Sequence, residues 1–132
     1  MSGIGSISSR DLAPYREYHA RRERRRLERR EALRQDCLRA TKAGIRRLAP
    51  EFAAIRALYL FGSLLQVGRF TEHSDIDVAI ECDDLETEGR FRRALEEDLR
   101  RNVDLRLHEG GVAWAVEAYG ECVYEREVPA PP

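Results

Sequence analysis

The segment from Tyr15 to Leu48 constrains the fold of this chain more than any other part of the sequence. It contains no proline, only Gly44 interrupts it, and Arg, Glu, Leu and Ala dominate it. Because these four residue types lose little conformational freedom in a helix, the segment predicts one long helix or two abutting ones. Pro50 ends the helical pattern, so the rest of the fold must come from the residues that follow.

The two halves of this predicted helix differ in their pattern. Residues 15–30 are polar almost all round, and arginines are frequent from Arg21 to Arg30. In the second half, apolar residues recur on one helical face, which predicts that this half packs against the body of the domain. The residues of that face are Leu33, Cys37, Ala40, Ile45 and Leu48.

The arginine run Arg21–Arg30 admits three interpretations. It can be a solvated helix supported by neighbouring glutamates, an arm that binds a partner protein, or a contact for nucleic acid. The run has no interleaved aromatic residues and matches no recognisable nucleic-acid-binding module. Direct nucleic-acid binding is therefore the least favoured of the three, and the sequence does not decide between the other two.

Three short segments after Pro50 are typical of strands. Residues 57–61 form an almost unbroken apolar run, and residues 76–80 are rich in β-branched side chains. Residues 103–107 alternate cleanly between apolar and polar side chains, as a half-buried strand does. We expect these three segments to form a small sheet.

The segments between and after these strands complete one compact α/β unit. Residues 83–89 are expected to form a loop, and residues 91–101 have the periodicity of an amphipathic helix. A short helix is predicted at 112–119, where Trp114 and Tyr119 are expected to fill the core or a partner surface. The final elements are an extended piece at 122–124 and a tail at 129–132, and residues 1–14 are expected to form a flexible tail at the other end.

The most informative motif is Gly62–Ser63, then eleven intervening residues, then Asp75 and Asp77. A glycine at the end of a buried strand lets the backbone turn sharply and approach a ligand closely. Ser63 adds a hydroxyl beside backbone amides at the start of a helical turn, which favours an anion such as phosphate. Asp75 and Asp77 are two residues apart on a predicted strand, so both carboxylates should project from one face and reach the same hard cation.

Asp104 supplies a third carboxylate if its strand neighbours the strand of Asp77, at a separation of roughly 5 Å. Two Mg²⁺ ions held roughly 3.5 to 4 Å apart would offset the repulsion among three carboxylates, activate an attacking hydroxyl and neutralise a leaving pyrophosphate. The predicted reaction is nucleotidyl transfer. Its catalytic and metal-binding residues are Asp75, Asp77 and Asp104, while Gly62 and Ser63 hold the β or γ phosphate.

These residues resemble the signature of the minimal nucleotidyltransferases of the DNA polymerase beta-like superfamily. In that family a strand ends in Gly-Ser, a short spacer follows, and the next strand opens with Asp-x-Asp. Tyr59–Ser63, Gly68 and Ser74–Ala79 carry the likeness, and Val103–Leu105 resembles the later strand with the third carboxylate. The resemblance extends from about Leu48 to Glu127 and implies the small mixed sheet of the nucleotidyltransferase fold over residues 49–128. The long helix that the residue pattern predicts at 15–48 precedes this domain, and the first 30 residues lie outside the resemblance.

Short, stand-alone members of that superfamily often resemble antitoxins encoded beside a HEPN-domain ribonuclease toxin, and some transfer AMP from ATP to a tyrosine of that toxin. The resemblance thus implies a Mg²⁺-dependent protein adenylyltransferase with ATP as its nucleotide substrate. It also implies a hetero-oligomer with a HEPN-domain toxin, because a second protein would supply the missing wall of the acceptor site.

Three alternative functions stay open. The first is an inactive antitoxin that acts by binding alone, because Leu64–Val67 replaces the small residue, Arg and Gly that many relatives carry soon after Gly-Ser. The second is a nucleotidyltransferase with a small-molecule acceptor, although such enzymes generally carry an additional helical domain, of which this sequence gives no sign. The third is a nucleic-acid-associated regulator that uses the arginine run.

The distribution of charge and the cysteine content indicate the kind of partner and the cellular compartment of the protein. Residues 1–50 hold fourteen Lys and Arg against six acidic residues, while the remainder holds nine against eighteen. An acidic half suits a carboxylate metal site, and a basic arm suits an anionic partner. The three cysteines are scattered, as free thiols in a reducing compartment would be, and no apolar run approaches the roughly 20 residues that span a bilayer. We therefore expect a cytoplasmic protein without a membrane segment.

Overall fold

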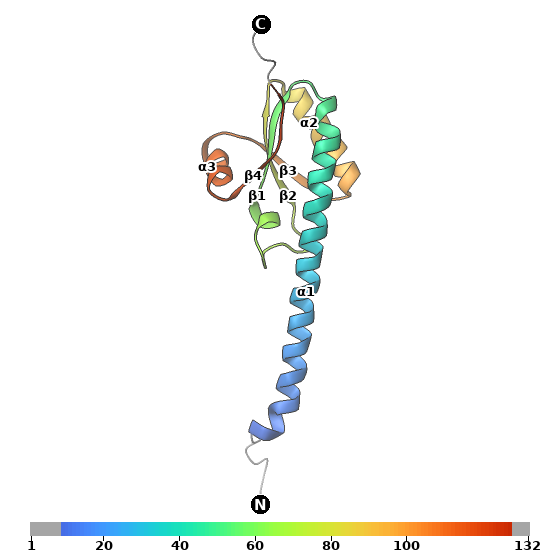
Figure 1. Ribbon diagram of the computed structural model, residues 1–132, viewed down its shortest axis with the longest axis vertical. Helices are drawn as coiled ribbons and strands as arrows, with labels where there is room; N and C mark the ends of the chain where they lie inside the picture. The colour runs from blue at the N-terminus through green and yellow to red at the C-terminus, as the bar shows by residue number, and fades with distance from the viewer. Residues whose placement is uncertain (1–8, 128–132) are drawn as a thin grey trace, which may run out of the picture.

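The computed structural model describes residues 9–127, so residues 1–8 of the predicted N-terminal tail and the predicted tail at 129–132 lie outside the described residues. Figure 1 shows a small sheet with helices on both faces and one helix that extends far beyond the sheet. This mixed sheet, flanked by helices and preceded by a long N-terminal helix, confirms the predicted α/β (α+β) fold class.

Helix α1, Ser9–Leu48, is one continuous helix of 40 residues. It begins before the predicted start, and residues 9–14, predicted to belong to a tail, are helical. Pro14 lies near its N-terminal end, where the missing N–H costs at most one intrahelical hydrogen bond. Gly44 lets α1 approach the neighbouring helix closely, because a Cβ at this position would stand 2.8 Å from Asp98 Oδ2.

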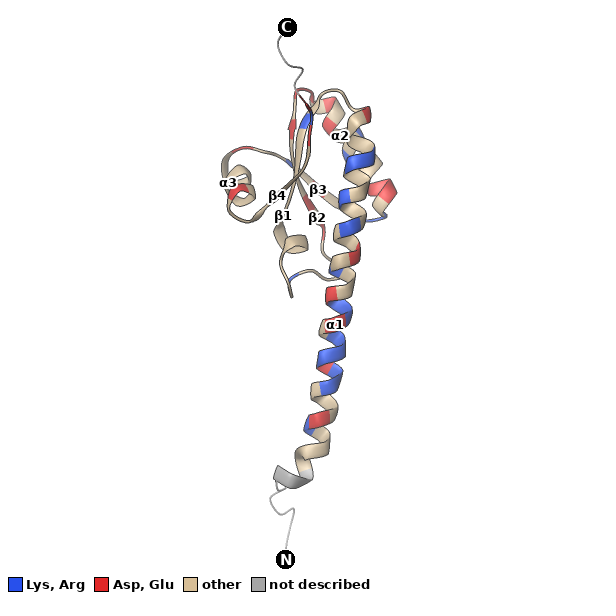
Figure 2. Ribbon diagram, viewed as in Figure 1, with Lys and Arg blue, Asp and Glu red and all other residues tan. Residues whose placement is uncertain are grey.

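The two halves of α1 have different surroundings. Residues 21–29 are exposed, and Figure 2 shows basic residues along the part of the helix that extends away from the sheet. The second half packs on the domain, where Ile45 is fully buried and Leu33, Cys37 and Leu48 are partly buried against the core. The predicted packing face is confirmed with one exception: Ala40 is exposed, and Thr41 is buried instead.

The remaining elements follow α1 along the chain. They are the 3-10 turn η1 (Ala49–Glu51), strand β1 (Ile55–Phe61), the 3-10 turn η2 (Gly62–Leu65), strand β2 (Ile76–Cys82), helix α2 (Leu85–Leu99), strand β3 (Val103–Leu107), helix α3 (Gly110–Tyr119) and strand β4 (Glu121–Glu125). All three predicted strands form, and the predicted extended piece at 122–124 lies within β4.

The predicted loop at 83–89 is wrong over most of its length, because α2 already begins at Leu85. Asp84 caps this helix: its carboxylate accepts hydrogen bonds from the Glu86 backbone N–H at 3.2 Å and from the Thr87 hydroxyl at 2.7 Å. An aspartate that satisfies otherwise unpaired groups of a first turn favours a helix start at that point. The acidic residues after Asp84, which look like loop composition, belong to this first turn.

The sheet has the strand order β3-β2-β1-β4, with β1 antiparallel to both of its neighbours and β2 parallel to β3. One face carries the core beneath α1 and α2, including Leu58, Leu60, Ile76 and Val78, all fully buried. Because side chains alternate along a strand, the residues between these core positions point to the opposite face. Helix α3 packs against that opposite face, which therefore stays only partly covered (Figure 1).

Among the described helices, none is long and apolar enough to cross a membrane. The three cysteines, Cys37, Cys82 and Cys122, are free thiols, as predicted.

Candidate active site

Asp77 and Asp104 lie side by side on the sheet face that α3 partly covers. They are Cα partners in the parallel pairing of β2 with β3, which confirms that the Asp104 strand neighbours the Asp77 strand. Cα partners on adjacent strands project to the same side, so the two carboxylates share one surface. The topology thus brings together two acidic residues that are far apart in the sequence.

Asp75 has a different structural setting from the predicted one. It precedes β2, which begins at Ile76, so its position depends on the preceding loop rather than on the sheet ladder. Within that loop Ser74 Oγ accepts a hydrogen bond from the Thr71 backbone N–H at 2.9 Å. The Ile76 N–H donates to the Asn102 carbonyl at 3.0 Å, which fixes the point where the loop joins the sheet.

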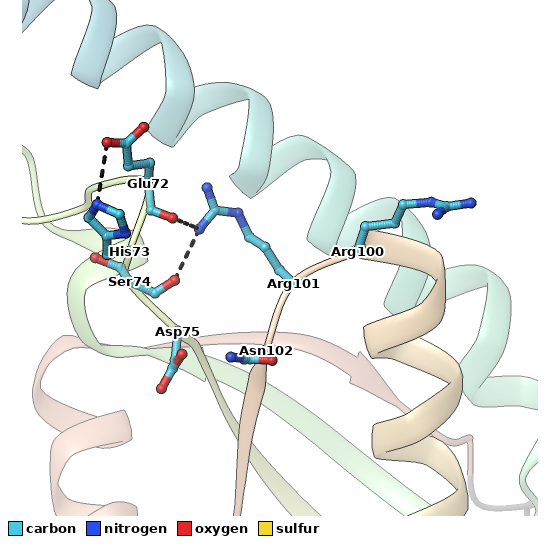
Figure 3. Close-up of a pocket in the computed structure, with 7 residues that line it drawn as sticks. All are labelled: Glu72, His73, Ser74, Asp75, Arg100, Arg101 and Asn102. Atoms are coloured by element: carbon cyan, nitrogen blue, oxygen red, sulfur yellow. Dashed lines mark hydrogen bonds and ion pairs between the residues drawn. The ribbon is translucent and has the colours of Figure 1, made fainter.

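Arg101 holds this loop from the other side. Its guanidinium donates to the backbone carbonyl of Glu72 at 3.2 Å and to that of Ser74 at 3.0 Å, and it lies 5.0 Å from the centroid of the Phe70 ring. Figure 3 shows these two hydrogen bonds, with the Asp75 side chain to the left of Asn102 and pointing away from α1. Arg101 is therefore a positioning residue for the loop that carries Asp75.

Gly62 lies in direct contact with Asp77. Its φ is +79°, in the left-handed region that favours glycine, and a Cβ on this residue would stand only 2.1 Å from Asp77 Oδ2. Phe61, the residue before it, is the Cα partner of Asp77 in the β1–β2 pairing. The turn that carries Gly62 and Ser63 is thus packed against the Asp77 carboxylate, as a phosphate-binding turn beside a metal site would be.

Arg34 was not expected at the site, and it ties α1 to this same turn. It is only 7% exposed, and its guanidinium donates to the Leu64 carbonyl in η2 at 3.0 Å. Glu31 on the same helix pairs with it at 2.6 Å. The one sequence signal that could have revealed Arg34 is its place beside Leu33 and three residues before Cys37, on the face of α1 that packs on the domain.

Replacing Arg34 with leucine is expected to destabilise the fold and lower activity, because the buried Leu64 carbonyl would lose its donor. An unsatisfied buried group of this kind costs about 1–3 kcal/mol, which urea unfolding would measure. Arg39→Leu is the matched control, since Arg39 also pairs with a residue three positions earlier on α1 but its side chain is 71% exposed. Equal losses in the two variants would remove Arg34 from this role.

The electrostatics of the site centre on Asp77. Burial and the neighbouring carboxylates of Asp104 and Asp75 raise the pKa of Asp77 to about 6, while Arg106 opposes this rise. Arg106 pairs with Asp104, its Nε lying 3.2 Å and its terminal nitrogen 3.1 Å from Asp104 Oδ2. Sequence reasoning missed Arg106, although its place two residues after Asp104 on an alternating strand puts both on one face.

The donor set fits Mg²⁺ in its chemistry, but its members are not gathered around one centre. Within residues 9–127, no three His, Cys, Asp or Glu side chains lie in an arrangement that could hold a metal ion. Carboxylates are the hard oxygen ligands that Mg²⁺ prefers, and Asp104 and Asp75 lie close enough to Asp77 to contribute, with burial, to its raised pKa. A pair of Mg²⁺ ions on Asp75, Asp77 and Asp104 therefore stays a prediction.

Comparisons with known proteins identify similar structures and a family. Among solved structures, the chain is similar to the crystal structure of a toxin-antitoxin with AMP-PNP, at 25% identity and a TM-score of 0.53. It is also similar to a mutant of the toxin-antitoxin MntA-HpeT, at 22% identity and a TM-score of 0.53. Both alignments cover 65% of this chain and 74% of the other, and the second shows the fold alone.

A further solved structure, a tri-AMPylated Shewanella oneidensis HEPN toxin in complex with MNT antitoxin, aligns at 21% identity with a TM-score of 0.47, over 68% of this chain and 73% of the other. A search of curated proteins gave no match. The family model described as "Polymerase beta, Nucleotidyltransferase" matches residues 44–128, which is more than half of the chain. The chain therefore belongs to the polymerase beta nucleotidyltransferase family.

Proposed function

We propose that this protein transfers AMP from ATP to a tyrosine of a partner HEPN ribonuclease toxin, and thereby acts as the antitoxin of that partner. The observation that carries this proposal is the meeting of Gly62, Asp77 and Asp104 on one partly covered sheet face. A phosphate-binding turn in contact with paired carboxylates is what nucleotidyl transfer requires. The similarity to a toxin-antitoxin structure with AMP-PNP supports both the nucleotide and the class of partner.

In this reaction the phenolic oxygen of the tyrosine forms a bond to the α-phosphorus of ATP. The bond from that phosphorus to the oxygen bridging to the β-phosphate breaks, pyrophosphate leaves, and the phenolic proton passes to water. Mg²⁺ held by Asp75, Asp77 and Asp104 would neutralise charge on the triphosphate and lower the pKa of the attacking hydroxyl. The chain's own contribution is to bind and orient the reactants.

Separate parts of the chain perform these positioning tasks. The amides and hydroxyl at Gly62 and Ser63 would bind the β or γ phosphate, and Arg34 keeps their turn in place through the Leu64 carbonyl. Arg101 fixes the loop that carries Asp75. Each of these arginines acts on a backbone carbonyl rather than on a reactant, so both are positioning residues.

The test of this function is the intact mass of the partner toxin after incubation with the protein, ATP and Mg²⁺. Mass added in steps of AMP supports the proposal. A stable complex without added mass would replace it with an inactive antitoxin that acts by binding alone. Mass added to a small molecule, with none on the toxin, would show a small-molecule acceptor instead.

The exposed aromatic side chains of α3 support a protein partner. Trp114 and Tyr119 are 64% and 67% exposed, and their rings form an edge-to-face pair with centroids 5.9 Å apart. Helix α3 packs on the sheet face that carries Asp77 and Asp104 (Figure 1). The two aromatic rings of α3 therefore lie on the side from which an acceptor would approach. Exposed Trp and Tyr are the residues that most often dominate the energy of protein interfaces. Of the two roles expected for these residues, the partner surface is the one that their exposure favours.

Replacing Trp114 with alanine is expected to weaken toxin binding by about 10- to 100-fold, as the loss of a dominant interface aromatic does. Isothermal titration calorimetry of the purified pair measures this change. Leu85→Ala is the matched control, because Leu85 is 78% exposed but lies at the start of α2, on the opposite face of the sheet. A Trp114 variant that binds like the Leu85 variant would place the toxin elsewhere.

A further inference from the structure

A cavity of about 360 Å³ lies between α3 and the sheet. One wall consists of the rings of Tyr59 and His108. The other consists of small or apolar residues and one carboxylate: Ala113, Val116 and Glu117 of α3, Gly120 between α3 and β4, and Cys122 of β4. We call this cavity the α3 slot. A flat wall of rings opposite a wall of small residues suits a flat apolar ligand.

A single carboxylate oxygen organises the aromatic wall of the α3 slot. Glu81 Oε1 accepts a hydrogen bond from the Tyr59 hydroxyl at 2.9 Å and lies 2.8 Å from His108 Nδ1. The Tyr59 and His108 rings are stacked, with centroids 4.2 Å apart and an interplanar angle of 21°. These contacts fix the orientation of both rings before any ligand arrives.

The same contacts set the chemistry that His108 can offer. With Nδ1 donating its proton to the Glu81 carboxylate, the neutral imidazole carries no proton on Nε2, which is then an acceptor. Among the described residues, no group is hydrogen-bonded to Nε2. His108 can therefore accept a hydrogen bond from an N–H of a ligand, whereas a ligand carbonyl at the same place would meet a lone pair.

The α3 slot lies on the same sheet face as the carboxylates. Tyr59 is the Cα partner of Ala79, which is two residues along β2 from Asp77, or roughly 7 Å of strand. His108 lies beside the C-terminal part of β2, because its backbone N–H donates to the Ile80 carbonyl at 2.9 Å. In a nucleotide, the ribose separates the α-phosphate from the base by a similar distance. A nucleotide with its α-phosphate at Asp77 would therefore place its base at the slot.

We propose that the α3 slot binds the base of the nucleotide substrate, with His108 Nε2 accepting a hydrogen bond from the exocyclic amine of the base. This inference rests on the proposed nucleotidyl transfer and names the feature of the substrate that is selected. Adenine, which carries an amine at position 6, is preferred over hypoxanthine, which carries a carbonyl there. His108 is then a specificity-determining residue, and the exposed pair Trp114 and Tyr119 lies outside the slot.

The three histidines of the chain make this proposal directly measurable. NMR resonances of His19, His73 and His108 can be followed while the full-length protein with Mg²⁺ is titrated with ATP, with ITP or with inorganic triphosphate, in the absence of any toxin. We expect ATP to shift the His108 ring resonances and triphosphate to leave them in place. ITP should need about tenfold more nucleotide for half-saturation, as the loss of one hydrogen bond predicts. Unshifted His108 resonances with ATP, or equal half-saturation by ATP and ITP, would overturn the proposal.

Two variants separate the slot from the phosphate site. Cys122→Phe fills the slot from the exposed edge strand β4, and Glu125→Phe, which adds the same ring to an exposed position of β4 outside the slot, is the matched control. Cys122→Phe should raise half-saturation by ATP at least about tenfold, while Glu125→Phe leaves it unchanged. His108→Phe keeps a ring in the wall but removes the acceptor, so it should abolish the preference for ATP over ITP. Unchanged ATP binding in Cys122→Phe, or a retained ATP preference in His108→Phe, would contradict the inference.

These measurements do not depend on catalysis, so the two proposals can fail separately. A His108 shift by ATP in a protein that never modifies its toxin would leave the slot standing and remove the proposed function. AMP transfer by a Cys122→Phe variant at wild-type ATP affinity would do the reverse. A His108 shift by N-acetyltyrosinamide with none by ATP would assign the slot to the acceptor and overturn the inference.

Discussion

Replacing Asp77 with asparagine is expected to abolish AMP transfer to the toxin and to stabilise the fold at neutral pH. The activity is lost because an amide cannot supply the charge that a bound cation needs, and such losses amount to about 10³-fold or more. Intact mass of the toxin over time measures the change. Transfer that stays close to the wild-type rate would remove Asp77 from the catalytic site.

The gain in stability follows from the raised pKa of Asp77. Its pKa is about 6 in the folded protein against an ordinary value of 3.8, because burial and the Asp104 and Asp75 carboxylates disfavour its charged form. Between these two pH values the folded protein binds more protons than the unfolded chain, so stability falls as pH rises through this window. Above it the penalty is complete, on the order of 1–2 kcal/mol once solvent screening of a half-buried group is allowed for.

Asparagine does not titrate and so avoids this penalty. Thermal unfolding in EDTA should therefore give a higher melting temperature for Asp77→Asn than for wild type at pH 7.5, and the difference should vanish near pH 4. Asp83→Asn is the matched control, because Asp83 carries an exposed carboxylate paired with Arg56 at 3.1 Å. A variant that loses activity and stability together would instead indicate a structural role for Asp77.

The parts of the fold that the sequence predicts are those that depend on local patterns. Strands β1, β2 and β3 follow from their apolar periodicity, and their pairing brings Asp77 beside Asp104 as expected. The start of α2 was missed because a capping aspartate and a loop aspartate look alike until the Thr87 hydroxyl and the Glu86 N–H are seen on Asp84. The position of Asp75 before β2 was missed for a similar reason, because the Asn102 carbonyl that sets the start of β2 comes from a distant segment.

The positioning arginines could not be predicted, for a different physical reason. The chain has 23 lysines and arginines, and most arginines on a charged helix are solvated. Arg34 differs from its neighbours only because the fold places the Leu64 carbonyl, 30 residues away, against it. Arg101 likewise bonds carbonyls of a loop more than 25 residues earlier. Such contacts depend on tertiary structure, so residue type and spacing do not reveal them.

Replacing Gly62 with alanine is expected to reduce AMP transfer by about 10²-fold or more, because the new Cβ would displace Asp77. Misplacing a reacting group by about 1 Å can cost this much, and the Cβ would stand 2.1 Å from Asp77 Oδ2 in an unrelaxed structure. The left-handed φ of +79° adds a backbone cost of roughly 1–2 kcal/mol for any residue with a Cβ. Transfer rates and urea unfolding together measure both effects.

A Gly68→Ala variant distinguishes the effect of the contact with Asp77 from the cost of a left-handed backbone. Its φ of +83° matches that of Gly62, but a Cβ there would meet nothing within 4 Å. Gly68→Ala should therefore lose the stability that strain alone removes while retaining most of the transfer activity, whereas Gly62→Ala should lose both. If the two variants lost activity equally, strain in the segment between β1 and β2 would explain the result. If only Gly62→Ala is inactive, the contact between the turn and the Asp77 carboxylate is what the site requires.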